Sequence, residues 1–306
     1  GDIVIYESTV YPGVTEEVCV PILEQTAKLT FNSDFFVGYS PERVNPSDKQ
    51  HTVENIKKIT SGSTPTIAAE IDALYNSVLT GGTYPAESIK VAEAAKVIEN
   101  AQRDVNIAFM NEIAQICNLL NIDTQSVINA AASKWNFLPF RPGLVGGHCI
   151  GVDPYYLIQK AKLHGLSPRL MMEARKTNDS MGGYIVHQIV NKLCTLGIKV
   201  KDSRILLLGF TFKENCPDIR NTKVIDLYHS LESFTHNITI YDPHANAETV
   251  QEEYGITLIT DMNKLPKNND VAVLCVAHNE MLSIDINQYI KPQVQTVCLG
   301  QAASAA

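Results

Sequence analysis

Cys149 is the residue whose surroundings most clearly suggest chemistry. It stands in Gly146-Gly147-His148-Cys149-Ile150-Gly151, shortly before Asp153-Pro154. Glycines let a backbone approach a ligand closely, and their amides can point at an anion. Asp153-Pro154 predicts an N-cap followed by proline in the first helical turn, and a nearby helix N-terminus favours a thiolate. Free cysteines are more often packing residues, but the glycine setting indicates a nucleophile at Cys149.

The seven cysteines are odd in number, scattered and never in a CxxC pair. This pattern excludes a disulfide framework and a zinc site, so we expect reduced thiols in a cytoplasmic protein and no bound metal. Cys19, Cys117, Cys194 and Cys275 lie in apolar patterns, and we interpret them as packing residues.

A second group of candidates follows helical spacing. Lys96, Asn100 and Arg103 lie at i, i+4 and i+7, and Glu93 and Asn111 extend the same polar stripe. Apolar neighbours on the other sides predict that the stripe is partly buried, although a solvated face is the usual arrangement of helix charges. A cation and an amide one turn apart suit a sugar hydroxyl or a developing oxyanion.

Polar residues also follow three predicted strands. Ser8 and Thr9 come after the first strand, Glu42 after the second, and Phe212 and Lys213 after a later one, with Arg220 a few residues on. In open parallel sheets the ligand crevice lies at the carboxyl ends of the strands. Two cations at such an edge suit phosphates, with capping and solvated loop charge as the structural alternatives.

The elements that must position these residues alternate between strands and helices. This order predicts a parallel, doubly wound α/β fold in both halves, with a long helix between them. We expect strands at 2–6, 34–39, 55–60, 205–209, 237–242 and 270–276. We expect helices at 14–29 (capped by Thr15), 65–79, 86–120, 123–132, 154–164, 167–178, 181–196, 222–231 and 250–254. No G-x-G-x-x-G turn occurs anywhere in the chain.

Composition removes other classes of protein. The 306 residues carry 25 Lys and Arg against 33 Asp and Glu, a net charge of −8. No basic stripe is present to neutralise the phosphates of nucleic acid or anionic lipid, and no apolar run is long enough to span a bilayer. A small anionic ligand held by a few cations remains compatible with this balance.

Five motifs in order resemble the UDP-glucose/GDP-mannose dehydrogenase family over essentially the whole chain. They are Glu7-Ser-Thr-Val-Tyr-Pro-Gly13, Ser40-Pro-Glu-Arg-Val44, Ala92-Glu-Ala-Ala-Lys96 with Asn100, Gly146-Gly-His-Cys149 with Asp153, and Gly209-Phe-Thr-Phe-Lys213 through Asp218-Ile-Arg220. Their variants are similar to the branch that oxidises UDP-N-acetylhexosamines, closest to the UDP-GlcNAc and UDP-GalNAc enzymes of capsule and O-antigen synthesis. The resemblance implies two Rossmann-like parallel-sheet domains, the first incomplete, joined by a long central helix and a helical dimerisation region. It also implies three domains: a partial NAD-binding domain at 1–85, a central domain at 86–200 and a UDP-sugar-binding domain at 201–306.

The resemblance further implies a four-electron oxidation with two NAD⁺, by a homodimer, through a thiohemiacetal and a thioester on Cys149. An aldehyde cannot be oxidised again by hydride loss until a nucleophile makes its carbon tetrahedral. Lys96 would stabilise the alkoxide, Asn100 would position the sugar, Asp153 and Thr9 would organise water and protons, and Glu42 would serve hydrolysis. The residues that would contact NAD are Ser8, Thr9, Val10 and Arg220. Those that would contact the UDP-sugar are Glu42, Lys96, Asn100, Arg103, Phe140, Arg141, Gly143, Gly146, Phe212 and Lys213.

Several alternatives remain open. The family's first strand and Gly-rich turn do not precede Gly1, so we expect this chain alone to be inactive. UDP-glucose, UDP-ManNAc and GDP-mannose are alternative substrates, and a nucleotide-sugar-binding and dimerisation module is the non-catalytic alternative. A cysteine hydrolase is disfavoured, because His148 is adjacent to Cys149 in sequence and poorly aimed for a catalytic base.

Overall fold

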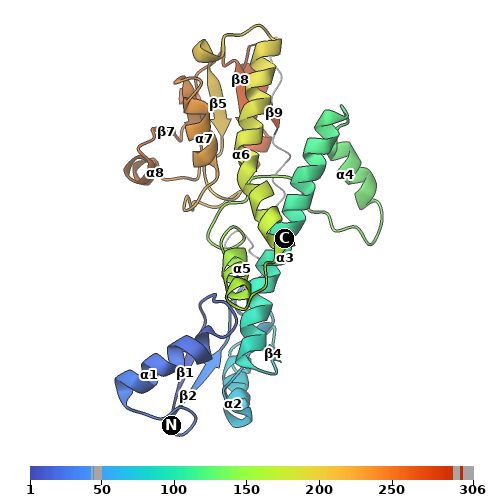
Figure 1. Ribbon diagram of the computed structural model, residues 1–306. Helices are drawn as coiled ribbons and strands as arrows, with labels where there is room; N and C mark the ends of the chain where they lie inside the picture. Colours follow the sequence, from blue (N-terminus) through green and yellow to red (C-terminus); the bar gives the residue numbers. More distant parts are fainter. Residues whose placement is uncertain (43, 45–49, 292–296, 299–306) are drawn as a thin grey trace. The chain divides into compact units, whose positions relative to one another are not determined.

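The computed structural model describes residues 1–306 except 43, 45–49, 292–296 and 299–306 (Figure 1). The chain forms two compact units, the first made of 1–102 with 152–169 and the second of 103–151 with 170–306. Each unit has parallel strands and a hydrophobic core of its own.

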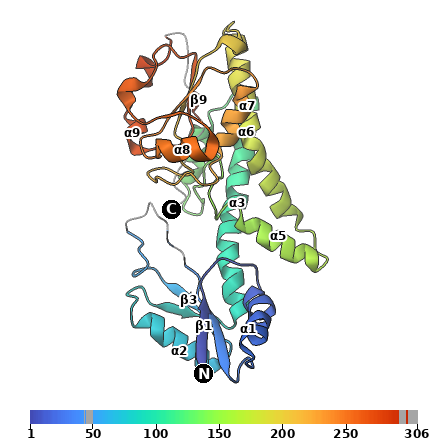
Figure 2. The same cartoon turned by 90° about the vertical axis from the view of Figure 1, so that its left-hand side faces the viewer.

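The first unit holds two pairs of parallel strands. β1 (Asp2–Tyr6) pairs with β2 (Phe35–Tyr39), and β3 (Lys58–Thr60) pairs with β4 (Thr83–Pro85). A π-helical turn (Thr15–Cys19) and α1 (Val20–Ala27) connect the first pair, and α2 (Pro65–Asn76) connects the second. α1 and α2 lie on opposite sides of β1 and β2 (Figure 2). The core of this unit consists of Val20, Phe35, Val37, Tyr39, Ile89 and Ala92.

The second unit contains a five-stranded parallel sheet in the order β7-β6-β5-β8-β9. These strands are β5 (Ile205–Leu208), β6 (Ile238–Tyr241), β7 (Leu258–Ile259), β8 (Val271–Leu274) and β9 (Val297–Cys298). Side chains alternate between the two faces of β5, so Ile205 and Leu207 face a different layer from Leu206 and Leu208.

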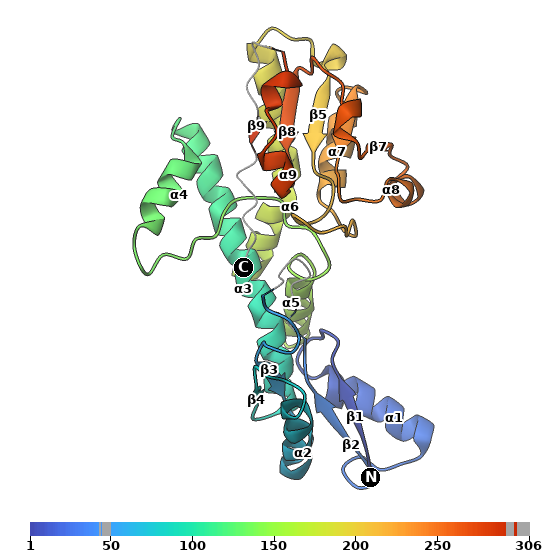
Figure 3. The ribbon, with the colours of Figure 1, turned by 180° about the vertical axis from the view of Figure 1, so that it is seen from behind.

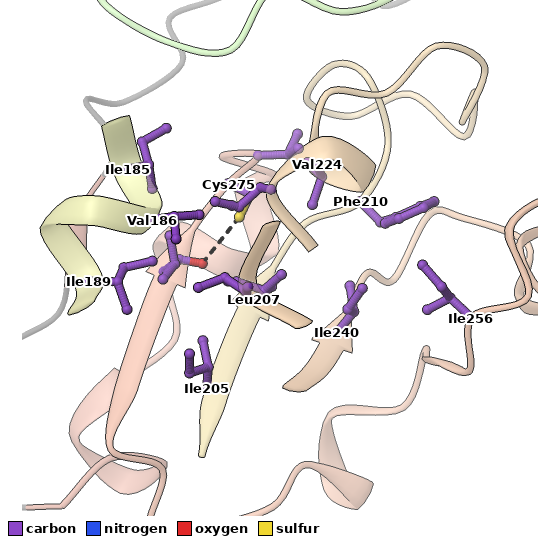
Figure 4. Packing of buried hydrophobic residues seen from close by; sticks show 14 of the residues in the cluster. Ile185, Val186, Ile189, Ile205, Leu207, Phe210, Val224, Ile240, Ile256 and Cys275 are labelled. Atoms are coloured by element: carbon purple, nitrogen blue, oxygen red, sulfur yellow. Dashed lines mark hydrogen bonds between the residues drawn. The ribbon is translucent and has the colours of Figure 1, made fainter. Parts of the chain in front are cut away.

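Helices cover both faces of this sheet. α6 (Arg169–Thr195), α7 (Val224–Glu232) and α8 (Ala247–Tyr254) share a core with Ile205 and Leu207, as Figure 4 shows for side chains of α6, α7 and the sheet. The opposite face packs against α9 (Asn279–Leu282) and a 3₁₀ turn (Ile286–Gln288). Figure 3 shows α9 on the other side of β8 from α6.

The remaining helices carry the candidate residues. α3 (Ile89–Leu119) passes from the first unit into the second after Gln102. α4 (Thr124–Ala132) is capped by Asp123, which accepts the Ser126 N–H, and folds back beside the end of α3 (Figure 1). α5 (Asp153–Leu163) belongs to the first unit.

The expected parallel α/β class is confirmed, and the long central helix is present. The short strands β4, β7 and β9 and the helix α9 were not expected, since two to four residues carry too little periodicity to be recognised. The division into domains at 1–85, 86–200 and 201–306 stays a prediction. No helix among the described residues has the length and hydrophobicity to cross a bilayer.

Four sequence-based expectations were wrong. Val14, not Thr15, is the cap of the π-helical turn, and Val152, not Asp153, is the cap of α5. The helices expected at 167–178 and 181–196 form one helix, α6, which continues through Gly182 and Gly183 without a break. Cys194 is exposed, because it falls on the outer side of α6.

Candidate active site

In the first unit, a cavity of about 100 Å³ brings together two of the predicted residues, Glu42 and Lys96. Its lining residues are Pro41, Glu42, Val53, Ile56, Lys57, Lys58, Ile59, Lys96 and Glu99. Lys96 is only 6% exposed, whereas Glu42 is exposed. The predicted partial burial of the α3 stripe is confirmed, since Glu93, Lys96, Asn100 and Asn111 are all buried. Arg43, from the Pro-Glu-Arg-Val motif, lies outside the described residues.

Lys58, at the start of β3, is a buried cation that sequence reasoning missed. Its Nζ lies 3.0 Å from Glu7 Oε1 and donates to the carbonyls of Ser40 (3.1 Å) and Pro41 (3.4 Å). These bonds hold the turn that leads to Glu42. The sequence did contain a signal for this residue, a lysine within a strand that is predicted to be buried. A lysine is almost never buried unless it is paired, so such a position predicts partners nearby.

Glu7 is shared between Lys58 and the hydroxyl of Tyr75, which donates to Glu7 Oε1 at 2.6 Å. Burial opposes ionisation of Glu7, but these two hydrogen bonds and the Lys58 charge lower its pKa overall. Burial and the Glu7 carboxylate together raise the pKa of Tyr75 to about 12. Glu7 is therefore an anion, and its carboxylate holds Lys58 in the wall of the cavity.

Asn100 and Asp153 are brought together within the first unit. Asn100 Nδ2 donates to Asp153 Oδ2 at 2.5 Å, and both residues are buried. Asn100 Oδ1 is buried too and has no hydrogen-bond partner among the described residues. The amide oxygen is thus an acceptor available to a hydroxyl, while Asp153 fixes the orientation of the amide.

Glu93, on α3, binds the main chain of the segment that follows β1. Its two carboxylate oxygens accept the N–H groups of Gly13 (2.5 Å) and Thr15 (2.9 Å), so a side chain of α3 caps the π-helical turn. Ser8 lies exposed just after β1, and Thr9 and Val10 are half-buried. The hydroxyl of Tyr39 donates to the Ser8 carbonyl at 3.1 Å.

In the second unit, the Gly146-Gly147 turn rests on the C-terminal sheet domain. The Gly147 N–H donates to the Asn221 carbonyl at 3.1 Å. Gly147 has φ +79°, and a Cβ on it would lie 2.7 Å from the Phe212 ring. Both glycines are required, since a Cβ on Gly146 would lie 2.7 Å from the Asn221 carbonyl oxygen. Two residues further on, Cys149 is exposed and forms no disulfide.

Phe212 and Arg220 belong to the same loop system. The Phe212 N–H donates to the Asp218 carbonyl at 3.1 Å, and Arg220 grips the Asp218 carboxylate with Nε (3.0 Å) and Nη2 (2.7 Å). Hydrogen bonding from Arg220 lowers the pKa of Asp218 against the effect of burial. His148 Nε2 lies 3.5 Å from Asp218 Oδ2, so the imidazole faces this carboxylate. Lys213 follows Phe212 directly and is half-buried.

Asp242, at the end of β6, holds the base of the Phe212 loop. Its carboxylate is fully buried and accepts from five donors: the N–H groups of Phe210, Thr211, His244 and Ala245, and Nε2 of His278. His278 Nδ1 accepts the Asn215 N–H at 2.8 Å, which leaves Nε2 to carry the proton donated to Asp242. Burial opposes ionisation, yet the hydrogen bonds from His278 and from the main chain at Phe210 and Thr211 lower the pKa of Asp242 to about 2.

The other expected substrate residues lie on α3 and on the loop before Cys149. Gly143 is hydrogen-bonded to the side chain of Asn111, and Arg141 donates through Nη1 to Gln125 on α4. Phe140 and Arg103 are half-buried. Glu42, Lys96, Asn100 and Asp153 thus lie in the first unit, and Arg103, the 140–149 loop and the 212–220 loop lie in the second.

Three family models together match most of the sequence. They describe the NAD binding domain (residues 1–79), the central domain (90–180) and the UDP binding domain (206–298) of the UDP-glucose/GDP-mannose dehydrogenase family. The chain belongs to this family. The family resemblance inferred from the five motifs is confirmed, and the match to the NAD binding domain supports the expected cofactor NAD, whereas the role of each site residue stays a prediction.

Proteins with similar sequences include two named UDP-N-acetyl-D-glucosamine 6-dehydrogenase. The one from Salmonella typhi is 57% identical over 92% of this chain and 65% of its own length, and the one from Pseudomonas aeruginosa is 57% identical over 92% and 66%. Protein CapL of Staphylococcus aureus is 51% identical over 92% and 66%. The chain therefore spans about two thirds of these relatives.

A solved structure shares the fold. The UDP-D-ManNAc dehydrogenase of Pyrococcus horikoshii superimposes with a TM-score of 0.86 at 26% identity, covering 98% of this chain and 73% of that one. The prediction of Rossmann-like parallel-sheet domains agrees with this neighbour.

Proposed function

We propose that the full-length protein oxidises C6 of a UDP-N-acetylhexosamine, UDP-GlcNAc or UDP-GalNAc, to the uronic acid for capsule or O-antigen synthesis. The observation that carries the proposal is the 57% identity over 92% of the chain with proteins named UDP-N-acetyl-D-glucosamine 6-dehydrogenase. NAD and UDP-sugars are cytoplasmic metabolites, so the proposed compartment is the cytoplasm.

The residues at the end of β1 support the proposal that NAD binds there. The Ser8 hydroxyl is exposed at the carboxyl end of a parallel strand, beside the half-buried Thr9 and Val10, which suits a polar ligand lying across the strand. Arg220 is a further candidate contact. NAD⁺ supplies the hydride acceptor for each of the two oxidations.

Lys96 and Asn100 are proposed to act on the C6 oxygen. A buried ammonium stabilises the alkoxide formed when the C6 hydroxyl loses its proton, and the open acceptor Asn100 Oδ1 orients a sugar hydroxyl. Asp153, held by Asn100, receives the released proton through water, with Thr9 assisting.

Cys149 is proposed to capture the aldehyde. Its thiolate adds to the C6 carbonyl to give a thiohemiacetal, whose oxidation gives a thioester. Water then cleaves the C–S bond, releasing the carboxylate and the thiol, and Glu42 acts as base in that step. The exposure of Cys149 on a turn held by Asn221 and Phe212 supports this role.

The UDP-sugar is proposed to lie against the 140–146 loop and Phe212–Lys213. Lys213 offers a cation for a phosphate, and Phe140, Arg141, Gly143, Gly146 and Arg103 complete the expected lining. The chemistry of this loop matches a nucleotide-sugar more closely than a cysteine hydrolase, because the His148 imidazole faces Asp218.

We also propose a homodimer that buries the apolar surface of α3, α4 and the following loop. Phe109 and Ile116 lie at i and i+7 on α3, Leu119 and Leu120 stand at its end, and Trp135 and Leu138 follow α4. All six are exposed, Trp135 at 97%. Sedimentation of the full-length protein at several concentrations tests this surface: Leu120→Glu is expected to give monomers, and an unchanged dimer would refute it.

The decisive experiment measures product and NADH with the full-length gene product. UDP-GlcNAc, UDP-GalNAc, UDP-ManNAc, UDP-glucose and GDP-mannose are compared, and the best substrate is expected to yield two NADH per sugar. Cys149→Ala is expected to stop after the first oxidation, whereas Cys194→Ala, at another exposed thiol, behaves as wild type. One NADH per sugar, or normal uronate from Cys149→Ala, would overturn the thioester route. Binding of UDP without any oxidation would favour the non-catalytic module.

A further inference from the structure

A chain of buried polar side chains joins α3 and α6 in the second unit. It consists of Asp104 and Asn111 from α3 and Arg175 and Asn178 from α6, each no more than 3% exposed. Arg175 Nη1 donates to Asp104 Oδ1 at 2.6 Å, and Asn178 Nδ2 donates to the same oxygen at 2.7 Å and to the Asp104 carbonyl at 3.0 Å. Asn178 Oδ1 accepts from Asn111 Nδ2 at 2.8 Å. We call these four residues the Asp104 relay.

The relay fixes the orientation of both amides. A carboxylate held by an arginine presents acceptors, so Asn178 must turn its NH₂ group toward Asp104 and its oxygen toward Asn111. Asn111 must then direct one N–H to Asn178. Its second N–H and its oxygen point the other way, which means that the Asn111 amide cannot flip without losing several buried hydrogen bonds.

The free side of the Asn111 amide binds the loop before Cys149. Asn111 Nδ2 donates to the Gly143 carbonyl at 3.1 Å, and Oδ1 accepts the Gly143 N–H at 2.8 Å. Both backbone groups of one loop residue are therefore held by one side chain whose own orientation is set from the helix behind it. Gly147, four residues later, has the separate anchor at Asn221.

A buried ion pair with attached amides is an expensive way to hold two helices together. Apolar side chains of similar volume are often as stabilising, whereas buried hydrogen bonds between side chains favour one arrangement of those side chains. α3 and α6 also have an ordinary contact further along, where Asn118 Nδ2 donates to the Tyr184 hydroxyl at 2.9 Å on the exposed side. The Asp104 relay differs from this contact because its last member, Asn111, is hydrogen-bonded to a loop as well as to α6.

We propose that Asn111 is a positioning residue, which fixes the main chain at Gly143 and so holds the substrate loop in the shape needed for the oxidation at C6. The kinetic part of this proposal rests on the proposed function. Asn111 itself is buried behind the loop and acts through Gly143.

The test compares Asn111→Ala with Asn118→Ala in the full-length protein. The control removes a hydrogen bond between the same two helices, two turns away and without a loop contact. Hydrogen exchange of the peptide that contains Gly143 is expected to be at least tenfold faster in Asn111→Ala than in the control, while β5 exchanges equally in both. If Asn111→Ala does not fold, Asn111→Asp keeps the size of the side chain and removes the donor to the Gly143 carbonyl.

The second readout is steady-state kinetics with the preferred UDP-sugar. Asn111→Ala is expected to lower kcat/KM at least tenfold at a temperature where it is fully folded, and Asn118→Ala is expected to match wild type. Equal exchange at Gly143 in the two variants would overturn the proposal, as would faster exchange spread evenly over the whole protein. A released loop with unchanged kcat/KM would overturn it too. Exchange is measured without substrate, so its outcome stands even if no UDP-sugar is oxidised.

Discussion

The Asp242 carboxylate offers a quantitative test, because its ionisation is linked to the stability of the second unit. The pKa of Asp242 falls from 3.8 to about 2 on folding, since the hydrogen bonds that the carboxylate accepts outweigh the effect of burial. A folded pKa below the unfolded one stabilises the protein above pH 3.8, and this contribution is lost as pH falls toward 2. A pKa difference of about two, at about 1.4 kcal/mol for each, corresponds to ~2–3 kcal/mol.

Asp242→Asn removes the titration while keeping the size of the side chain. Relative to wild type, the variant is expected to lose at least ~2 kcal/mol at pH 7, and the gap is expected to shrink by ~1 kcal/mol between pH 5 and pH 3. The assay is urea unfolding at each pH, followed through the urea concentration at which peptides of β5 and β8 lose hydrogen-exchange protection. Both strands belong to the sheet of the second unit, so the signal comes from that unit alone.

The amide introduced by Asp242→Asn also disrupts hydrogen bonds at every pH. The test therefore lies in how the gap between wild type and variant changes with pH, and not in its absolute size. Asp285→Asn, at an exposed 3₁₀ turn of the same unit, controls for the loss of one negative charge. A gap that stays constant from pH 7 to pH 3 would refute the argument that ionised Asp242 is held by its five donors.

Three further substitutions test the candidate site. Lys96→Met is expected to lower kcat by a factor of roughly 10²–10³, the usual contribution of a positioned oxyanion partner. The control Lys90→Met, on an exposed turn of the same helix, is expected to leave kcat unchanged. Equal losses of kcat in the two variants would contradict a special role for Lys96. Gly147→Ala is expected to cost ~1–3 kcal/mol more in urea unfolding than Gly165→Ala, because both have positive φ but only the first meets an aromatic ring at 2.7 Å. Equal costs would show that the turn has room for a methyl group. Glu93→Gln is expected to destabilise the first unit by ~1–3 kcal/mol, as one of two buried N–H groups loses its acceptor, and unchanged exchange of the π-helical turn would contradict this.

The sequence predicted the elements with strong, uninterrupted patterns. The run at 205–209 is apolar throughout and became β5, and the segment at 86–120 lacks Gly and Pro and became α3. The glycine context of Cys149 likewise predicted an accessible thiol on a tight turn, and the thiol is exposed. Each of these inferences depends on residues that are close together along the chain, where periodicity and turn chemistry act.

The two caps were mispredicted because their partners are distant in sequence. Thr15 lies inside the π-helical turn, and the N–H groups of Gly13 and Thr15 at its start are bound by Glu93, which lies 78–80 residues away. Asp153, expected to cap α5, accepts from Asn100, 53 residues away. Capping rules weigh only the next three or four residues, so they do not detect a distant residue that binds the start of a helix or engages the expected cap.

Lys58 and Asp242, which sequence reasoning missed, share one structural role with Asn111, whose contact with the loop was not predicted. Lys58, Asn111 and Asp242 are each buried, and each binds the main chain of a segment that carries candidate residues: Ser40–Pro41, Gly143 and Phe210–Thr211. A backbone group is the same at every position, so the sequence of the held segment gives no sign of its partner. The signal lies instead in the sequence of the binding residue, where a charge or an amide interrupts a helix or strand that is otherwise predicted to be buried. Burying a polar group costs free energy unless the group is hydrogen-bonded, so a buried polar side chain predicts a partner. In this family, a buried polar side chain on a strand or helix is therefore a reason to search for a loop that it binds.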